Sequence, residues 1–154
     1  MYPGALPIKK PLTARTRSNS ATIAHRWHMD EEVQRWLRIA ESDLVSAELL
    51  HRGGQYPQAL FFFQRAIEKT LKALILKRSR AVPPRIHNLV KLVRHCGLEA
   101  PREQLLMLQD LTRYYSGSRY PEGMGEAPLE VSPEEVDRLS TFTKEFLAWL
   151  KQRL

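Results

Sequence analysis

Residues 56–77 read YPQALFFFQRAIEKTLKALILK, and this stretch decides the fold. Between Ala59 and Ile75 its apolar side chains recur at steps of three and four residues, which is the period of one helix face. Phe61 and Phe62 widen that face beyond a single stripe. A helix that is apolar most of the way round is central to its fold or faces a second subunit. We therefore predict a central helix over this stretch.

The sequence on both sides of this stretch predicts further helices. Asp30 begins an acidic run that suits a helix N-terminus, because carboxylates favour the positive end of the helix dipole. Gly97 is a suitable C-terminal cap, and Ser132 with Glu135 has the spacing of a capping box. No segment shows the alternation of a strand. The sequence predicts an all-α fold, an antiparallel bundle of about five helices, with the other four expected near residues 30–52, 86–96, 101–115 and 133–150.

The first 28 residues differ in composition from the rest. They contain three prolines and no apolar periodicity, so they bury too little apolar surface to offset the entropy of ordering. They hold five basic residues and no acidic one, which accounts for five of the seven net positive charges. We expect a disordered basic leader over 1–28 and a helical domain over 29–154. Three interpretations of the leader remain: an arm that touches phosphates, an organelle transit peptide, or translation starting at Met29.

Composition limits the cellular setting and the chemistry. Cys96 is the only cysteine, so the chain has no internal disulfide and cannot build a cysteine-rich zinc site. The longest apolar run stops at Gln64, far short of the ~18 residues needed to cross a bilayer. We expect a cytoplasmic protein without a membrane segment. No glycine-rich phosphate loop, nucleophile elbow or metal motif occurs, so we expect no metal and no cofactor.

The central helix carries an unusual group of polar residues beside its aromatic side chains. The group consists of Gln64, Arg65, Glu68, Lys69 and Lys72. Glu68 precedes Lys72 by four residues, which is the favourable order for an ion pair on a helix. The pair is either a solvated surface contact or, because this helix has little polar surface to spare, part of a cleft.

Two further groups are candidates for binding. His87 follows a pair of prolines at the start of the expected third helix. Its role is either structural, as a helix cap or a hydrogen-bond partner across the bundle, or it belongs to a binding site. Residues 113–121 contain Arg113, Arg119, Tyr120 and two more tyrosines. Arginine makes bidentate phosphate contacts and tyrosine stacks on bases, as a nucleotide or RNA site requires. The alternative is a surface loop fixed by tyrosines that pack beneath it.

The order of these features is similar to that of a known family. The first helix carries Trp36 and Ala40-x-x-Asp43, and the second is entered through Gln55-Tyr56-Pro57-Gln58-Ala59. They are followed by the segments Gln64-x-Ala66-x-Glu68-Lys69-x-x-Lys72-Ala73, Pro84-x-x-His87-x-Leu89 and Arg119-Tyr120-Pro121. Together, over roughly residues 32–150, they resemble the HEPN domain family.

This resemblance implies a helical bundle, usually a homodimer, often encoded beside a minimal nucleotidyltransferase in toxin–antitoxin pairs. Active members are metal-independent ribonucleases with an Arg-x(4–6)-His motif late in the domain. Arg113 matches the arginine, but Ser118, Arg119 and Tyr120 occupy the positions for the histidine. Without that imidazole, no obvious group titrates near neutral pH to take the proton of a 2′-hydroxyl. The Arg-Tyr-Pro sequence resembles a subgroup regarded as nucleotide-binding.

The sequence thus favours a non-catalytic HEPN subunit that forms a homodimer and pairs with a minimal nucleotidyltransferase. It would bind a nucleotide or RNA phosphate with Arg113, Arg119 and nearby Lys72, and the candidate ligand-binding set is Glu68, Lys69, Lys72, His87, Arg113, Arg119 and Tyr120. Two alternatives remain: a ribonuclease toxin with Tyr120 or His87 as its acid–base group, and an assembly subunit without a ligand.

Overall fold

Five α-helices form the part of the chain that the computed structural model describes, residues 14–117 and 130–154. They are α1 (Ala14–Arg52), α2 (Tyr56–Ser79), α3 (Leu89–His95), α4 (Arg102–Gly117) and α5 (Pro133–Lys151). No strand occurs within these residues, which confirms the all-α prediction. None of the described helices has an apolar stretch long enough to cross a membrane.

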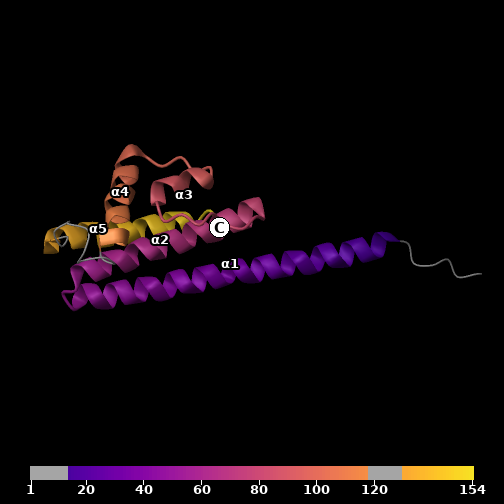
Figure 1. Ribbon diagram of the computed structural model, residues 1–154, viewed down its shortest axis with the longest axis horizontal. Helices are drawn as coiled ribbons and strands as arrows, with labels where there is room; N and C mark the ends of the chain where they lie inside the picture. Colours follow the sequence, from indigo (N-terminus) through magenta and orange to yellow (C-terminus); the bar gives the residue numbers. More distant parts are fainter. Residues whose placement is uncertain (1–13, 118–129) are drawn as a thin grey trace, which may run out of the picture.

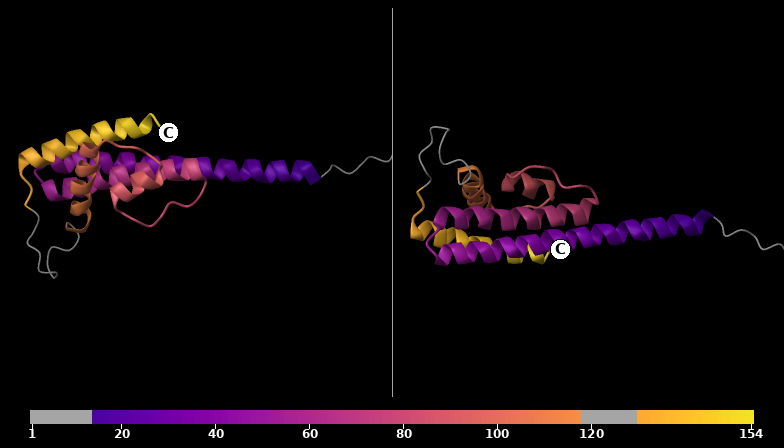
Figure 2. Two further views of the ribbon diagram at one scale, coloured as in Figure 1. Left: turned by 90° about the horizontal axis from the view of Figure 1, so that it is seen from above. Right: turned by 60° about the horizontal axis from the view of Figure 1, so that its bottom comes forward.

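The helix α2 lies at the centre, as predicted. It runs antiparallel to α1, α5 packs beside both of these helices, and the short α3 and steeply inclined α4 cover another side of α2 (Figures 1 and 2). Phe63, Ile67 and Leu71 are fully buried on it, and burying each such side chain stabilises the fold by roughly 1.5–3 kcal/mol. The apolar surface of α2 is therefore covered mainly by helices of its own chain rather than left for a second subunit.

The start of α1 differs from the prediction. The helix begins at Ala14 instead of Asp30, so the expectation of disorder is wrong for residues 14–28, while residues 1–13 lie outside the described part. The side chains of residues 21–28 are exposed, so burial contributes little to this segment. No glycine or proline interrupts the sequence from Ala14 to Arg52, and extending a formed helix needs only one further hydrogen bond per residue. Helix propagation from the packed part of α1 therefore explains why this segment is helical although it projects beyond the bundle (Figure 1).

The ends of the later helices follow local chemistry. Ser132 caps α5 by accepting a hydrogen bond from the backbone N–H of Glu135, as predicted. Gly97 adopts a φ of 64° just after α3, a left-handed conformation that suits glycine. The helix α3 is shorter than expected because Asn88 is its N-cap and accepts from the N–H of Lys91.

Candidate functional site

A charged cluster lies inside the domain around Glu68, whose side chain is fully buried. Its Oε1 atom accepts hydrogen bonds from Lys72 Nζ at 2.8 Å and from Lys69 Nζ at 3.3 Å. Its Oε2 atom lies 3.3 Å from Gln64 Nε2 and 3.1 Å from His87 Nδ1. We call these five residues the Glu68 cluster. One carboxylate thus organises donors from α2 and from the α2–α3 connection.

Helical spacing explains most of this cluster. Gln64, Glu68 and Lys72 are each four residues apart and therefore share one face of α2. Burial raises the pKa of Glu68, but the hydrogen bond from Lys72 and the charges of Lys69 and Lys72 outweigh it, so the pKa lies below its ordinary value of 4.5. Glu68 is thus an ionised, compensated carboxylate. The interpretation of a solvated surface pair is wrong, because this pair is buried.

The structure brings His87 to the cluster from a distant part of the sequence. Gln64 Nε2 donates to the backbone carbonyl of His87 at 2.8 Å, which fixes the chain there. The imidazole stacks on the ring of Tyr115 with centroids 4.3 Å apart, and 46% of the His87 side chain is exposed. His87 therefore hydrogen-bonds across the bundle, as one interpretation predicted, while Asn88 provides the cap of α3. Its ring joins the buried carboxylate to the surface.

One atom of the cluster is incompletely satisfied. Gln64 Oε1 is buried and accepts no hydrogen bond from the described residues, although Gln64 Nε2 has two acceptors. Buried acceptors of this kind are uncommon, because leaving one unpaired costs roughly 1–3 kcal/mol. A water molecule or a ligand donor would satisfy this oxygen.

Aromatic rings adjoin the two lysines of the cluster. Trp36 of α1 lies beneath both ammonium groups, with Lys69 Nζ 5.4 Å and Lys72 Nζ 5.8 Å from its ring centroid. These distances are within the range of cation–π attraction. Lys72 is nearly enclosed, with 7% of its side chain exposed, whereas Lys69 keeps 15%. Lys69 is therefore the better placed of the two to meet a ligand.

A second aromatic and cationic group continues along the same side of α2. Arg65 pairs with the buried Asp43 of α1 at 3.2 Å, and its guanidinium lies 5.7 Å from the ring centroid of Phe61 and 5.8 Å from that of Phe62. Phe61 in turn stacks on Tyr115 of α4 with centroids 5.6 Å apart. We call the surface of Trp36, Phe61, Phe62, Arg65, Lys69, His87 and Tyr115 the α2 face. It presents half-buried rings beside positive charges.

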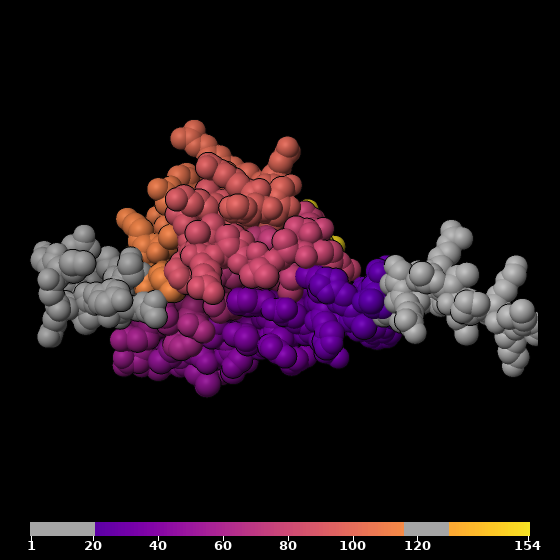
Figure 3. Space-filling view, turned by 45° about the vertical axis from the view of Figure 1, so that its right-hand side comes forward, coloured from indigo at the N-terminus to yellow at the C-terminus, as the bar shows by residue number. Residues whose placement is uncertain are grey.

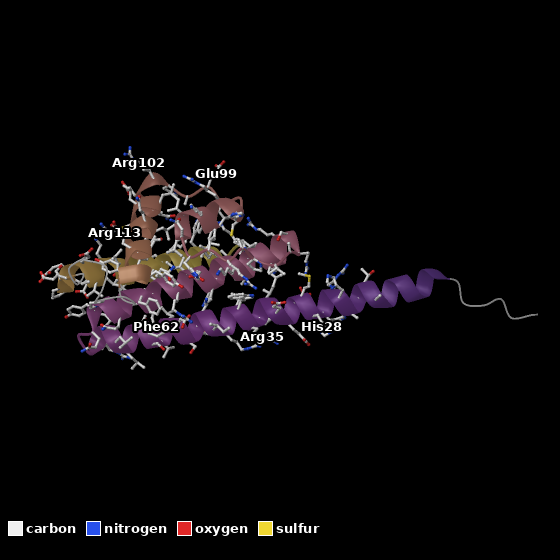
Figure 4. All side chains as sticks on the ribbon, in the orientation of Figure 1. His28, Arg35, Phe62, Glu99, Arg102 and Arg113 are labelled. Carbon is white, nitrogen blue, oxygen red and sulfur yellow. The ribbon has the colours of Figure 1, made fainter. Side chains whose placement is uncertain are left out.

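The remaining predicted residues do not join this face in the described structure. Arg113 pairs with Asp110 at 3.3 Å, and Asp110 also holds Arg138 of α5. Arg113 precedes Tyr115 by two residues and so projects from the opposite side of α4 (Figure 4). Lys72 is enclosed beside Trp36, and the predicted use of Arg113 together with Lys72 stays a prediction. Arg119 and Tyr120 lie outside the described residues.

Sequence reasoning named Trp36 and Asp43 only as marks of the family and assigned them no role in the site. Asp43 carried a detectable signal, because it is an acidic residue within the buried stripe that includes Val33, Ala40 and Ala47. A buried charge usually has a partner, and here that partner is Arg65. Trp36 carried no such signal, since an aromatic residue on an apolar stripe is ordinary core.

Comparisons with known proteins agree with this architecture. The HEPN domain family model matches residues 33–153. The crystal structure of TT1696 from Thermus thermophilus is similar with a TM-score of 0.66 and 26% identity, covering 79% of this chain and 98% of that one. The crystal structure of ST0689, an archaeal HEPN homologue, is similar with a TM-score of 0.63 and 28% identity, covering 79% and 96%. A search of curated proteins gave no match. The chain belongs to the HEPN domain family.

Proposed function

We propose that this protein is a non-catalytic HEPN subunit that binds a nucleotide or an RNA phosphate on the α2 face and pairs with a minimal nucleotidyltransferase. The observation that carries the proposal is the pair of lysines held by one buried carboxylate beside Trp36. Glu68 fixes these cations in place, so a ligand meets preorganised charge instead of flexible surface lysines. Preorganisation lowers the entropic cost of binding.

The charge balance of the face favours an anion. Arg65 and Lys69 of the face and the enclosed Lys72 behind it carry three positive charges, against the two buried carboxylates of Asp43 and Glu68. Half-buried rings lie beside these charges, and base stacking on such rings contributes roughly 1–3 kcal/mol per base. A ligand that combines an aromatic base with a phosphate matches both features.

A matched pair of lysine variants tests this site. Lys69→Ala removes the more exposed cation of the cluster, and Lys144→Ala removes a surface lysine on α5 that is 52% exposed and pairs with Glu48 at 3.7 Å. Titrating ATP and a short single-stranded RNA, we expect Lys69→Ala to weaken binding at least about tenfold, near 1.5 kcal/mol for a lost charge-assisted bond. Lys144→Ala should leave binding unchanged. Equal effects of the two variants would contradict a localised site.

Arg119 remains a sequence-based candidate for the same ligand. Arg119→Ala should weaken binding by at least ~1.5 kcal/mol, and Arg119→Lys should recover little because lysine lacks the bidentate fork. Wild-type binding should fall steeply with salt, since phosphate contacts release counterions. Binding that ignores both Arg119 and salt would exclude a phosphate ligand.

The nucleotidyltransferase partner is tested separately. Co-expression of the full chain with a minimal nucleotidyltransferase encoded beside it should give a complex that survives size-exclusion chromatography. A tight complex together with no binding of ATP or RNA would leave only the assembly subunit. The absence of any complex would remove the partner from the proposal without affecting the ligand site.

One observation favours the ribonuclease as a second candidate. With a proton on Nδ1 donated to Glu68, His87 Nε2 carries a lone pair, and the imidazole is half exposed. Nε2 would take the proton of an RNA 2′-hydroxyl, the 2′-oxygen would bond to phosphorus, and the P–O5′ bond would break. The imidazolium would then return the proton to the leaving 5′-oxygen. This replaces the missing histidine of the Arg-x(4–6)-His motif by one from the α2–α3 connection.

RNA cleavage assays separate the two candidates. The non-catalytic subunit leaves single-stranded RNA intact, whereas the ribonuclease produces 2′,3′-cyclic phosphate ends. His87→Asn would abolish such cleavage. The control is His95→Asn, which changes an exposed histidine at the end of α3 and would leave cleavage intact. Cleavage that Arg113→Ala also abolishes would favour a toxin.

A further inference from the structure

The buried apolar side chains of the described residues form two clusters instead of one. The larger cluster contains Phe63, and the smaller one consists of Met29, Val33, Ala73 and Leu76. Ala40 of α1 is only 5% exposed but belongs to neither cluster. Protein interiors are close-packed, with few gaps larger than a water molecule. A buried alanine outside both clusters therefore indicates a gap in the core.

A cavity of about 300 Å³ occupies this gap between α1, α2 and α5. Leu44 and Leu147 on its wall pack with the larger cluster, and Leu37 packs with the smaller one. The small side chains of Ala40 and Thr70 leave the space open. The hydroxyl of Thr70 donates to a backbone carbonyl of its own helix at 2.9 Å, so this donor is already used. The inner part of the cavity is thus mainly apolar.

The mouth of this cavity carries two opposite charges. Glu41 of α1 and Lys151 of α5 are exposed and line the same cavity, but neither forms an ion pair with a described residue. The C-terminal end of α5 lies beside the middle of α1 (Figure 2). Leu154 completes the wall there, and Lys77 holds it by donating from Nζ to its backbone oxygen. A carboxylate and an ammonium group thus flank an apolar cavity without neutralising each other.

The cavity lies apart from the α2 face. His87 and Tyr115 place that face beside α3 and α4, whereas the cavity has α5 as its third wall. From the side drawn in Figure 3, α1 to α4 make up most of the described surface and α5 is almost hidden. On α1, Trp36 of the face and Leu37 of the cavity are neighbours whose side chains point roughly 100° apart. The two places are therefore separate candidates for binding.

We propose that this cavity binds a free α-amino acid with an apolar side chain, such as leucine. The side chain of the ligand enters the apolar part, its ammonium group donates to Glu41, and its carboxylate accepts from Lys151. Ligand sites between helices are apolar pockets with a few polar groups that fix orientation, and this cavity is at the small end of their size range. A peptide does not match, because its ammonium and carboxylate groups lie at opposite ends.

Calorimetric titration of the full chain with L-leucine up to about 10 mM tests the site, since this range detects even a millimolar dissociation constant. L-serine keeps both charges but buries about three fewer carbon atoms, so it should bind at least about tenfold more weakly. Leucinamide lacks the carboxylate and N-acetylleucine lacks the ammonium group. Each should bind about fivefold more weakly than leucine, the effect of one exposed charge pair.

Variants of the cavity test the residues that hold the ligand. Glu41→Gln and Lys151→Met each remove one charge and should weaken leucine binding about fivefold. The matched control is Lys144→Met, about two turns earlier on α5 and outside the cavity, which should leave binding unchanged. In Glu41→Gln, leucine and N-acetylleucine should bind equally. Ala40→Leu fills the cavity and should abolish binding while denaturant unfolding shows that the fold is kept.

Three results would overturn the proposal: no heat of binding with about 10 mM leucine, equal affinities for leucine and its two blocked forms, or leucine binding that persists in a folded Ala40→Leu. If Ala40→Leu does not fold, the variants at the exposed Glu41 and Lys151 decide. Loss of the nucleotidyltransferase complex in Ala40→Leu without any leucine binding would overturn it in favour of a partner side chain in the cavity. Lys69→Ala should leave leucine binding unchanged, and Lys151→Met should leave ATP binding unchanged, so each site can fail separately.

Discussion

Replacing Glu68 with glutamine tests the central feature of this structure. Glu68→Gln keeps the size of the side chain but removes the negative charge that two lysines and His87 share. Lys72, with 7% of its side chain exposed, then keeps a positive charge in a buried position without a carboxylate. The variant therefore measures how much the buried carboxylate stabilises the fold.

The magnitude follows from burial and from the contacts that remain. Removing one partner of a buried ion pair costs about 3–5 kcal/mol. We expect the lower end, ~3 kcal/mol, because Lys69 stays partly exposed and both lysines keep their contacts with Trp36. Glu68→Gln combined with Lys72→Met should recover more than half of this loss, since it also removes the uncompensated charge. Lys72→Met alone completes the double-mutant cycle, which gives the coupling energy of the pair.

The pH dependence has a defined sign. Burial raises the pKa of Glu68, but the Lys72 hydrogen bond and the two lysine charges lower it further, so the folded value lies below 4.5. A carboxyl group with a lowered folded pKa contributes stability above its unfolded pKa, and this contribution is lost as the pH falls through the folded value. The difference in the free energy of unfolding between wild type and Glu68→Gln should therefore be largest near neutral pH. It should become smaller below about pH 4.5.

Urea unfolding at pH 7 and at pH 4 measures these quantities. The control is Glu48→Gln, which removes a partly exposed carboxylate 3.7 Å from Lys144 and should change stability by less than about 0.5 kcal/mol. A loss below about 1 kcal/mol in Glu68→Gln, or equal losses in the two variants, would refute the reasoning. A difference in the free energy of unfolding that grows as the pH falls would also refute the reasoning.

Three further predictions concern other parts of the chain. Deleting residues 1–28 should leave the thermal midpoint of dilute protein nearly unchanged, because residues 21–28 are exposed; a drop of many degrees in calorimetry would show that this segment docks. Burial raises the pKa of Cys96 to about 11, so its native thiol should react slowly with a disulfide reagent at pH 8 and rapidly after unfolding. Tyr114→Phe removes the hydrogen bond from the buried Tyr114 hydroxyl to Glu135 at 2.9 Å and should cost about 1.5 kcal/mol in denaturant unfolding; a neutral change would show that water replaces it.

Local signals in the sequence located most of the fold. Apolar spacing predicted α2 as the central helix, and Ser132 and Gly97 marked helix ends because capping depends on a few neighbouring residues. The start of α1 was missed because the residues before Asp30 lack an apolar stripe. Packing does not determine that segment, and an uninterrupted helix extends by propagation alone.

The site was harder to predict because its members come from three separate parts of the chain. The spacing of Glu68 and Lys72 was visible in the sequence, but their burial depends on Trp36 and His87, which approach from other segments. Arg113 and Tyr115 are neighbours in sequence and were grouped together, yet they project from opposite sides of α4. Sequence proximity within a helix is therefore a poor guide to a shared surface, whereas a spacing of four residues is a good one.

The Glu68 cluster links the stability of the domain to the geometry of its surface. A buried carboxylate with two lysines stabilises less than well-packed apolar residues of similar volume often do, because every charge must be removed from water. The cluster nevertheless fixes Lys69 beside Trp36 and holds His87 through both its ring and its backbone. An apolar replacement of Glu68 and Lys72 could preserve the fold but would release both groups. Such a double variant should therefore lose ligand binding even where its stability is restored, which separates positioning from folding.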